Sequence, residues 1–311
     1  MVEAYTVSSQ YSLAVGARQQ IRRPIASVVV PAHNEAKVVI RCLGGLLDEA
    51  EPGEFEVVVI ANGCIDQTAE LARSFHPDVH VVELAIADKV AALRAGDSAT
   101  TLFPRVYVDA DVSLATSALR ALVDALGGEA AVAAAPRMVV AVQGRPAAVR
   151  AWYRVWLASA YRSGACVGSG VYGLNAAAHA LVSPWPETFA DDLHVRLSLG
   201  VSRCQVVEGH HFAQQAPYSL RSLVGVRARI VAANRAIGGG EAWPSQRSSL
   251  LRQLAQPRRW PDLAVYAGVA AAARVLARRQ FVRTRWVRDD TARKAAAPQV
   301  TAPQVTATEV A

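Results

Sequence analysis

Cysteine is scarce in this sequence, and its four copies are dispersed. Cys42, Cys64, Cys166 and Cys204 lie far apart and form no Cys-x-x-Cys pair. A structural zinc site or a disulfide framework needs closely spaced cysteines, so neither is expected here. We expect four reduced thiols, most of them buried.

Long hydrophobic runs are missing as well. The longest uninterrupted apolar stretch, residues 263–273, ends at Arg274 and has 11 residues, whereas a membrane-spanning helix needs about 20. Near the start, Glu3 and the polar residues 6–10 leave neither the basic lead nor the apolar stretch of a signal peptide. We therefore expect a cytoplasmic protein without a transmembrane segment.

Lysine supplies only three of the 33 basic residues, and the net charge of +7 is unevenly distributed. Residues 201–311 hold 17 Lys and Arg against 6 Asp and Glu, so the first 200 residues are net acidic. A basic C-terminal third can meet phosphate groups on a nucleotide, a nucleic acid or an anionic membrane. The acidic first part and the sparse aromatic residues among the arginines fit nucleic acid poorly, so we expect no nucleic-acid partner.

Two common enzyme signatures are absent. No Gly-x-Gly-x-x-Gly follows the first strand-like segment, which argues against a dinucleotide-binding dehydrogenase. The residues around Ser169 lack the Gly-x-Ser-x-Gly spacing of a serine nucleophile.

What the sequence does contain is an alternation of strand-like and helix-like segments. The apolar runs predict strands over residues 25–30, 55–60, 79–84, 105–108 and 130–136, and helix-spaced apolar residues predict helices over 35–47, 67–75, 89–99, 117–126 and 147–161, with Asp66 capping the second helix. Such an order is typical of an α/β fold with a mostly parallel, Rossmann-like sheet flanked by helices.

Polar clusters follow three of these strands. They are residues 32–35, residues 62–66 and the triplet 109–111, which contains Asp109 and Asp111. Ligands of parallel sheets bind beyond the carboxyl ends of the strands, so these loops are expected to share one edge. Carboxylates one residue apart can face one ligand, and their hard oxygen donors suit Mg²⁺ or Mn²⁺ carrying a diphosphate.

The order of these motifs resembles that of family 2 glycosyltransferases with the A-type nucleotide-sugar-binding fold. The resemblance rests on residues 28–35 (Val-Val-Val-Pro-Ala-His-Asn-Glu), residues 62–68, Lys89 with Ala95-Gly96, Asp109-Ala-Asp111 and Asp191-Asp192. It covers residues 25 to about 235 and implies metal-dependent transfer of a sugar from a nucleotide-diphosphate sugar, most simply a UDP sugar, to a glycan, lipid-linked or small-molecule acceptor.

The resemblance also implies roles for single residues. Asp109 approaches the ribose and the metal, and Asp111 holds the cation that bridges the diphosphate. Asn62 stands where the family usually has an Asp facing the base, which leaves the identity of the base open. The remaining nucleotide-binding residues are expected to be Pro31, Ala32, Glu35 and Lys89.

Asp191 and Asp192 occupy the place of the family's Glu-Asp pair. By resemblance Asp192 is the base that takes the acceptor hydroxyl proton, Asp191 is an acceptor or orienting contact, and the reaction inverts the anomeric carbon. Both could instead act only as helix caps. Because Asn62 and Asp191 depart from the usual pattern, the alternative is a catalytically silent protein that binds a nucleotide sugar, or a phosphate- or nucleic-acid-binding protein.

Further candidates have weaker support in the sequence. His211, next to His210, is a candidate metal ligand, against a purely structural role. Arg227 and Arg229 can contact the diphosphate or the acceptor, or lie on a solvated helix face. They stand near the place of the Gln-x-x-Arg-Trp motif of sugar-polymer synthases, but Val226 and Ile230 replace its Gln and Trp, which favours single transfer over processive synthesis.

The predicted organisation has four parts. Residues 1–22 form a loose lead-in, residues 23–235 the catalytic domain, residues 236–294 a basic helical extension, and residues 295–311 a disordered tail that repeats Ala-Pro-Gln-Val-Thr. Within the extension, residues 258–285 combine an apolar helix with flanking arginines. This segment either lies on an anionic membrane or is a buried helix with arginines at its ends.

Overall fold

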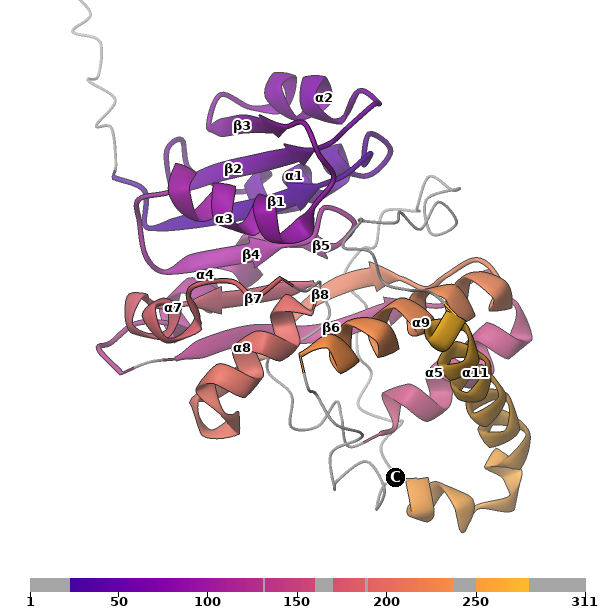
Figure 1. Cartoon of the computed structure of the whole chain (residues 1–311). Helices are drawn as coiled ribbons and strands as arrows, with labels where there is room; N and C mark the ends of the chain where they lie inside the picture. The colour runs from indigo at the N-terminus through magenta and orange to yellow at the C-terminus, as the bar shows by residue number, and fades with distance from the viewer. Residues whose placement is uncertain (1–22, 131, 160–169, 188–189, 238–249, 280–311) are drawn as a thin grey trace, which may run out of the picture.

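The computed structural model describes residues 23–130, 132–159, 170–187, 190–237 and 250–279. The predicted lead-in and the predicted disordered tail both lie outside these residues. At the centre is an eight-stranded sheet with the order β3-β2-β1-β4-β7-β6-β8-β5. Helices cover both of its faces (Figure 1), so the expected α/β class is confirmed.

The first half of the sheet is parallel, as predicted. It consists of β1 (Ala26–Ala32), β2 (Phe55–Asn62), β3 (Val79–Leu84) and β4 (Arg105–Val108). The helices that connect and flank these strands are α1 (Val39–Leu47), α2 (Thr68–Phe75), α3 (Lys89–Ala99) and α4 (Thr116–Ala125). The carboxyl ends of the four strands therefore point to one edge.

Two predicted helix starts were wrong. The first helix begins at Val39 and not at residue 35, because Asn34 has a positive φ of 55° and the Glu35 N–H donates to Thr68 Oγ1 at 2.7 Å. Gln67, not Asp66, is the N-cap residue of α2. Asp66 nevertheless accepts the Thr68 N–H at 3.1 Å, so it still binds the first turn.

The second half of the sheet is mixed. It consists of β5 (Ser113–Leu114), β6 (Ala133–Ala141), β7 (Val171–Leu174) and β8 (Cys204–Gln215). The strand β7 runs antiparallel to β4 and β6, whereas β6 and β8 are parallel. The sequence predicted only β6 among these strands and placed it a few residues early. The β8 strand is half-exposed and rich in Glu, His and Gln, so it lacks the apolar pattern of a strand.

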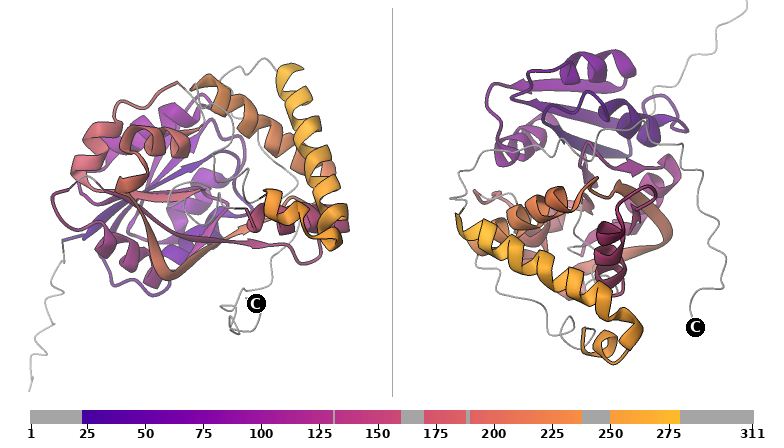
Figure 2. Two further views of the ribbon diagram at one scale, coloured as in Figure 1. Left: turned by 90° about the horizontal axis from the view of Figure 1, so that it is seen from below. Right: turned by 90° about the vertical axis from the view of Figure 1, so that its right-hand side faces the viewer.

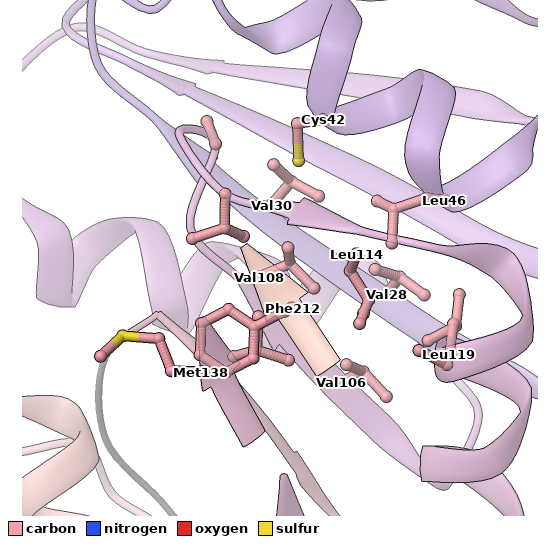
Figure 3. Packing of buried hydrophobic residues seen from close by; sticks show 14 of the residues in the cluster. Val28, Val30, Cys42, Leu46, Val106, Val108, Leu114, Leu119, Met138 and Phe212 are labelled. Carbon is pink, nitrogen blue, oxygen red and sulfur yellow. The ribbon is translucent and has the colours of Figure 1, made fainter. Parts of the chain in front are cut away.

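Alternating residues of the central strands form two cores. Val28 and Val30 of β1 face the side covered by α1 and α4, in a core that also contains Cys42, Leu46 and Leu119 (Figure 3). Val29, between them in sequence, faces α3 and belongs to the second core. This period of two is the signature of a strand buried on both faces.

Five more helices follow β6 along the chain, and residues 250–254 are helical as well. The five helices are α5 (Ala147–Leu157), α7 (Ala176–Val182), α8 (Asp191–Leu199), α9 (Leu220–Ala236) and α11 (Trp260–Arg279), with short 3₁₀ turns over Val201–Arg203 (η1) and Pro257–Arg259 (η2). Helices α9 and α11 pack closely through small side chains: Ala228, Ala232, Ala273 and Ala277. Figure 2 shows α11 along one side of the molecule, remote from α7.

Candidate functional site

Hydrogen bonds lock together the loops that follow β1 and β2. His33 Nδ1 donates to the carbonyl oxygen of Asn62 at 2.7 Å, and the side-chain oxygen of Asn34 accepts the Ile65 N–H at 2.8 Å. The bond between Glu35 and Thr68 joins the same two segments. Pro31, Ala32 and Glu35 are thereby held at the same sheet edge as Asn62.

Asn62 is fully buried and binds the backbone of Asp88 through both ends of its amide. Its Nδ2 donates to the Asp88 carbonyl at 2.7 Å, and its Oδ1 accepts the Asp88 N–H at 3.1 Å. The Asp88 carboxylate in turn accepts the N–H groups of Val90 and Ala91 and so caps α3. Asn62 therefore fixes the start of α3, where Lys89 is the first residue.

Lys89 connects the two acidic motifs. Its Nζ lies 3.2 Å from Asp109 Oδ1 and 2.8 Å from Asp191 Oδ1, and the side chain is largely buried. Burial opposes the ammonium charge, but the attraction of Asp109 and Asp191 outweighs it and raises the pKa of Lys89 above its usual value. This cation remains charged at physiological pH and partly neutralises two neighbouring carboxylates.

Asp109 experiences opposing electrostatic effects. The net effect raises the pKa of its carboxyl to about 6: burial is the largest cause, Lys89 acts to lower the pKa, and the nearby charges of Asp191 and Asp111 act to raise it. Asp109 is therefore influenced by two carboxylates, those of Asp191 and Asp111, and by one ammonium group, that of Lys89.

The turn that carries Asp109 and Asp111 is fixed from two sides. The Asp109 N–H donates to the Gly170 carbonyl at 2.7 Å, and Arg41 donates to the Asp111 carbonyl at 3.1 Å. Gly170 has a φ of 104°, and a Cβ there would lie 3.1 Å from Asp109 Oδ2. Glycine is thus required where β7 approaches the acidic turn.

Asp191 and Asp192 form the first turn of α8 but have different surroundings. Asp191 is buried and accepts the Tyr172 hydroxyl at 2.9 Å, opposite its contact with Lys89. Burial and the Asp191 charge raise the pKa of Tyr172, so its hydroxyl remains a donor. Asp192 is half-buried, and one of its oxygens accepts the Leu193 N–H at 2.7 Å. The positive end of the helix dipole favours both charges.

The donor set suits a cation that is shared with a ligand. Among the residues that the structure describes, no three His, Cys, Asp or Glu side chains come close enough to hold a metal ion by themselves. Mg²⁺ and similar hard cations commonly take only one or two carboxylates from the protein, with substrate phosphates and water completing the shell. Asp109 and Asp111 fit that arrangement.

The structure does not bring His211 to this cluster. The antiparallel pairing of β5 with β8 places Ser113 opposite Ala213 and Leu114 opposite Phe212. His211 is the next residue of β8 beyond Phe212, on the side that leads away from Asp111. The pairing of β6 with β8 instead places His211 opposite Arg137. Its role as a metal ligand stays a prediction without geometric support.

The two arginine candidates lie in the C-terminal helical layer, on α9. The guanidinium of Arg227 stacks over the ring of Trp152 on α5, with its carbon 5.2 Å from the ring centroid. Arg229 has an intermediate exposure on the same helix. Arg227 therefore lies against α5 within the helical layer.

Sequence reasoning missed a second polar cluster behind the site. Asp97 on α3 accepts hydrogen bonds from Arg105 at 2.9 Å, Tyr107 at 2.5 Å, His179 at 2.9 Å and Trp185 at 2.7 Å. Tyr107 stacks on Tyr172, whose hydroxyl binds Asp191. The sequence signal was weak, because these donors come from β4, α7 and the loop before α8, and only folding brings them together.

Comparison with known proteins adds a family and several structural relatives. Residues 27–179 match the model of glycosyl transferase family 2. A segment of 95 residues is 32% identical to glycosyltransferase AglE of Haloferax volcanii, covering 29% of this chain and 31% of that protein. The match thus spans under a third of the length of this curated relative.

Two solved structures share the fold. The mannosyltransferase PcManGT of Pyrobaculum calidifontis, in complex with GDP-Man and Mn²⁺, has a TM-score of 0.54 and 22% identity, covering 83% of this chain and 79% of that one. The glucosyl-3-phosphoglycerate synthase of Mycobacterium tuberculosis, in complex with Mn²⁺, UDP and glucosyl-3-phosphoglycerate, has a TM-score of 0.50 and 19% identity, covering 71% and 82%. At these identities the likeness concerns the fold alone.

Proposed function

The chain belongs to glycosyl transferase family 2 through residues 27–179, and we propose that it transfers a single sugar from a nucleotide-diphosphate sugar to a hydroxyl group of an acceptor. One observation carries the proposal. The ammonium of Lys89 binds both Asp109 after β4 and Asp191 at the start of α8, so the expected donor-binding and acceptor-activating motifs meet in one place.

On the donor side, Pro31, Ala32 and Glu35 hold the nucleoside, and Asp109 and Asp111 hold Mg²⁺ or Mn²⁺ together with the diphosphate. When bound, the cation stabilises the charge of the departing diphosphate. Uracil is the base that we expect. Because one structural relative binds GDP-Man and another UDP, both nucleotides should be tested.

On the acceptor side, Asp192 removes the proton of the attacking hydroxyl. The division of roles between the two aspartates follows from their surroundings: Lys89 and Tyr172 hold the buried Asp191 in place, whereas the half-buried Asp192 lies beside it with greater access to solvent. Asp191 then orients the acceptor or the sugar. Attack from the face opposite the diphosphate inverts the anomeric carbon.

Turnover can be tested without knowing the natural acceptor. The protein is incubated with UDP and GDP sugars, Mn²⁺ and a panel of glycan, lipid-linked and small-molecule acceptors, and the released nucleoside diphosphate is measured. We expect release with at least one donor and its loss in Asp192→Asn, with donor binding retained. Asp124→Asn, an exposed change on α4, is the matched control.

A catalytically silent protein that only binds nucleotide sugars is the competing function. It is motivated by Asn62 and Asp191, which stand where the family usually has an Asp and a Glu. Saturable donor binding without any release of nucleoside diphosphate would support it. Equal release by the wild type and Asp192→Asn would contradict the assignment of the base.

A further inference from the structure

The outer face of α11 is apolar although it is exposed. Residues 263–273 contain no charged side chain, and one face of the helix buries Val269, Ala273 and Ala277 against its neighbours. The opposite face presents a helix-spaced series of exposed residues: Trp260, Ala264, Ala267, Ala271 and Val275. A helix that is apolar all round normally lies buried, so this face is made to be covered.

The segment before α11 extends the same kind of surface. Leu251 and Leu254 are 65% and 52% exposed, and Trp260 and Val275 are 58% and 51% exposed. The indole N–H of Trp260 donates to the Leu254 carbonyl at 3.0 Å, which places the ring beside that segment. Figure 2 (right) shows α11 across the surface, with no described helix or strand in front of it.

The charges around this surface have one sign. Arg252, Arg258, Arg274 and Arg278 are exposed before and after the apolar run. The sole acidic residue between 250 and 279 is Asp262, and both of its oxygens accept hydrogen bonds from Arg154 at 2.6 and 2.7 Å. The surface is thus an exposed apolar strip bordered by arginines, and its single carboxylate is already paired. Such a surface is complementary to one that is both anionic and apolar.

This charge pattern selects one occupant. A second copy of the chain packed on the same face would bring arginines against arginines, since a two-fold interface is self-complementary. In the described part of the chain, no helix has the length and hydropathy needed to cross a bilayer. A helix that lies in the headgroup region buries Leu, Trp and Ala side chains and keeps arginines at the level of the phosphates.

We propose that the outer face of α11, together with Leu251, Leu254 and the flanking arginines, is a docking surface for an anionic lipid bilayer. Apolar side chains enter the headgroup boundary and the arginines contact lipid phosphates. The proposal is independent of the sugar-transfer reaction, because none of these residues belongs to the acidic cluster.

The test is co-sedimentation of the full chain with sucrose-loaded vesicles of phosphatidylglycerol and phosphatidylcholine in equal parts, and with phosphatidylcholine alone. We expect binding to the anionic vesicles only. Loss of one arginine near an anionic surface weakens binding about five-fold, so Arg252→Gln with Arg258→Gln should weaken it about 25-fold. Leu251→Ser should weaken it several-fold further through the apolar contact.

Matched controls lie on the other side of the molecule. Leu181→Ser on α7 removes a leucine that is 52% exposed, and Arg203→Gln removes an exposed arginine after α8. Both should bind vesicles like the wild type, and circular dichroism checks that all variants fold. Absent binding to anionic vesicles, equal loss in the controls, or a dimer in solution that Leu251→Ser dissociates would overturn the proposal. Release of nucleoside diphosphate without vesicles is measured in parallel, so a failure of sugar transfer remains distinguishable.

Discussion

Lys89 donates a charge-assisted hydrogen bond of 2.8 Å to Asp191, which joins the first turn of α3 to the first turn of α8. The same ammonium contacts Asp109 at the end of β4. Segments far apart in the sequence thus share one buried cation. The arrangement makes Lys89 the link between the donor side and the acceptor side of the proposed site.

Replacing this lysine should affect both stability and donor binding. Lys89→Met leaves two neighbouring carboxylates without their counter-charge, and removing one partner of a buried ion pair costs about 3–5 kcal/mol of unfolding free energy. We expect a lower urea midpoint and weaker binding of a nucleoside diphosphate. Lys37→Met, which removes an exposed lysine, serves as the control. Equal stability of the two variants would show that Lys89 is not needed to balance the carboxylates.

The structure gives Asn62 a positioning role that can be separated from contact with a base. Asn62→Asp removes the bond donated to the Asp88 carbonyl and sets a carboxylate against that oxygen, which we expect to cost about 1–3 kcal/mol of unfolding free energy. Denaturant unfolding measures this loss. A variant of unchanged stability with an altered preference between UDP and GDP would instead support a direct contact with the base.

Asp97 should stabilise the fold at neutral pH and lose this effect in acid. Burial acts to raise the pKa of its carboxyl, but hydrogen bonds from His179, Tyr107 and Trp185 outweigh it, so the folded-state pKa lies below the ordinary value. A depressed carboxyl pKa gives stability that is present above the unfolded pKa of about 3.9 and is lost as the pH falls through the folded pKa. We expect Asp97→Asn to cost about 2–4 kcal/mol at neutral pH.

Unfolding of the wild type and Asp97→Asn at pH values on both sides of this range measures the difference. The gap between the two proteins should narrow as the solution is acidified below a pH of about 4. A gap that is constant with pH would mean that Asp97 acts through packing and not through its charge.

Gly96 is required by close packing between α3 and the sheet. A Cβ at this position would lie 2.3 Å from Val29 Cγ1, so Gly96→Ala should cost about 1–3 kcal/mol through overpacking. A Cβ at Gly225 on α9 would meet nothing within 4 Å in the described part of the chain, so Gly225→Ala should instead stabilise by up to about 1 kcal/mol. Thermal unfolding of both variants measures whether the two changes in stability have the expected opposite signs.

Much of the first half of the fold could be predicted from the sequence. The strand 79–84, the helix 89–99 and the strand 105–108 have the predicted bounds, because their apolar periodicity decides their structure locally. The β5 strand has only two residues and depends on pairing with β8, and β8 is half-exposed. Neither strand therefore has a sequence pattern from which it could be predicted without the tertiary structure.

The residues of the site also differ in whether local sequence patterns could predict their positions. Asp109 could be placed because it ends a strongly apolar strand, and Asp191 because a paired acidic motif opens a helix. Tyr172 could not, since its hydrogen bond to Asp191 depends on how β7 pairs with β4. Likewise, the position of Arg227 against Trp152 follows from the packing of α9 on α5 and has no sequence pattern of its own.

The central claim is that the carboxylates at the end of β4 bind a nucleoside diphosphate through a divalent cation. Calorimetric titration of the wild type and Asp111→Asn with UDP and with GDP, each with and without Mn²⁺, tests it most directly. We predict saturable binding of one nucleotide by the wild type that needs Mn²⁺, and loss of that Mn²⁺ dependence in Asp111→Asn. Nucleotide binding of equal affinity with and without the metal, or unchanged Mn²⁺-dependent binding in the variant, would contradict the account.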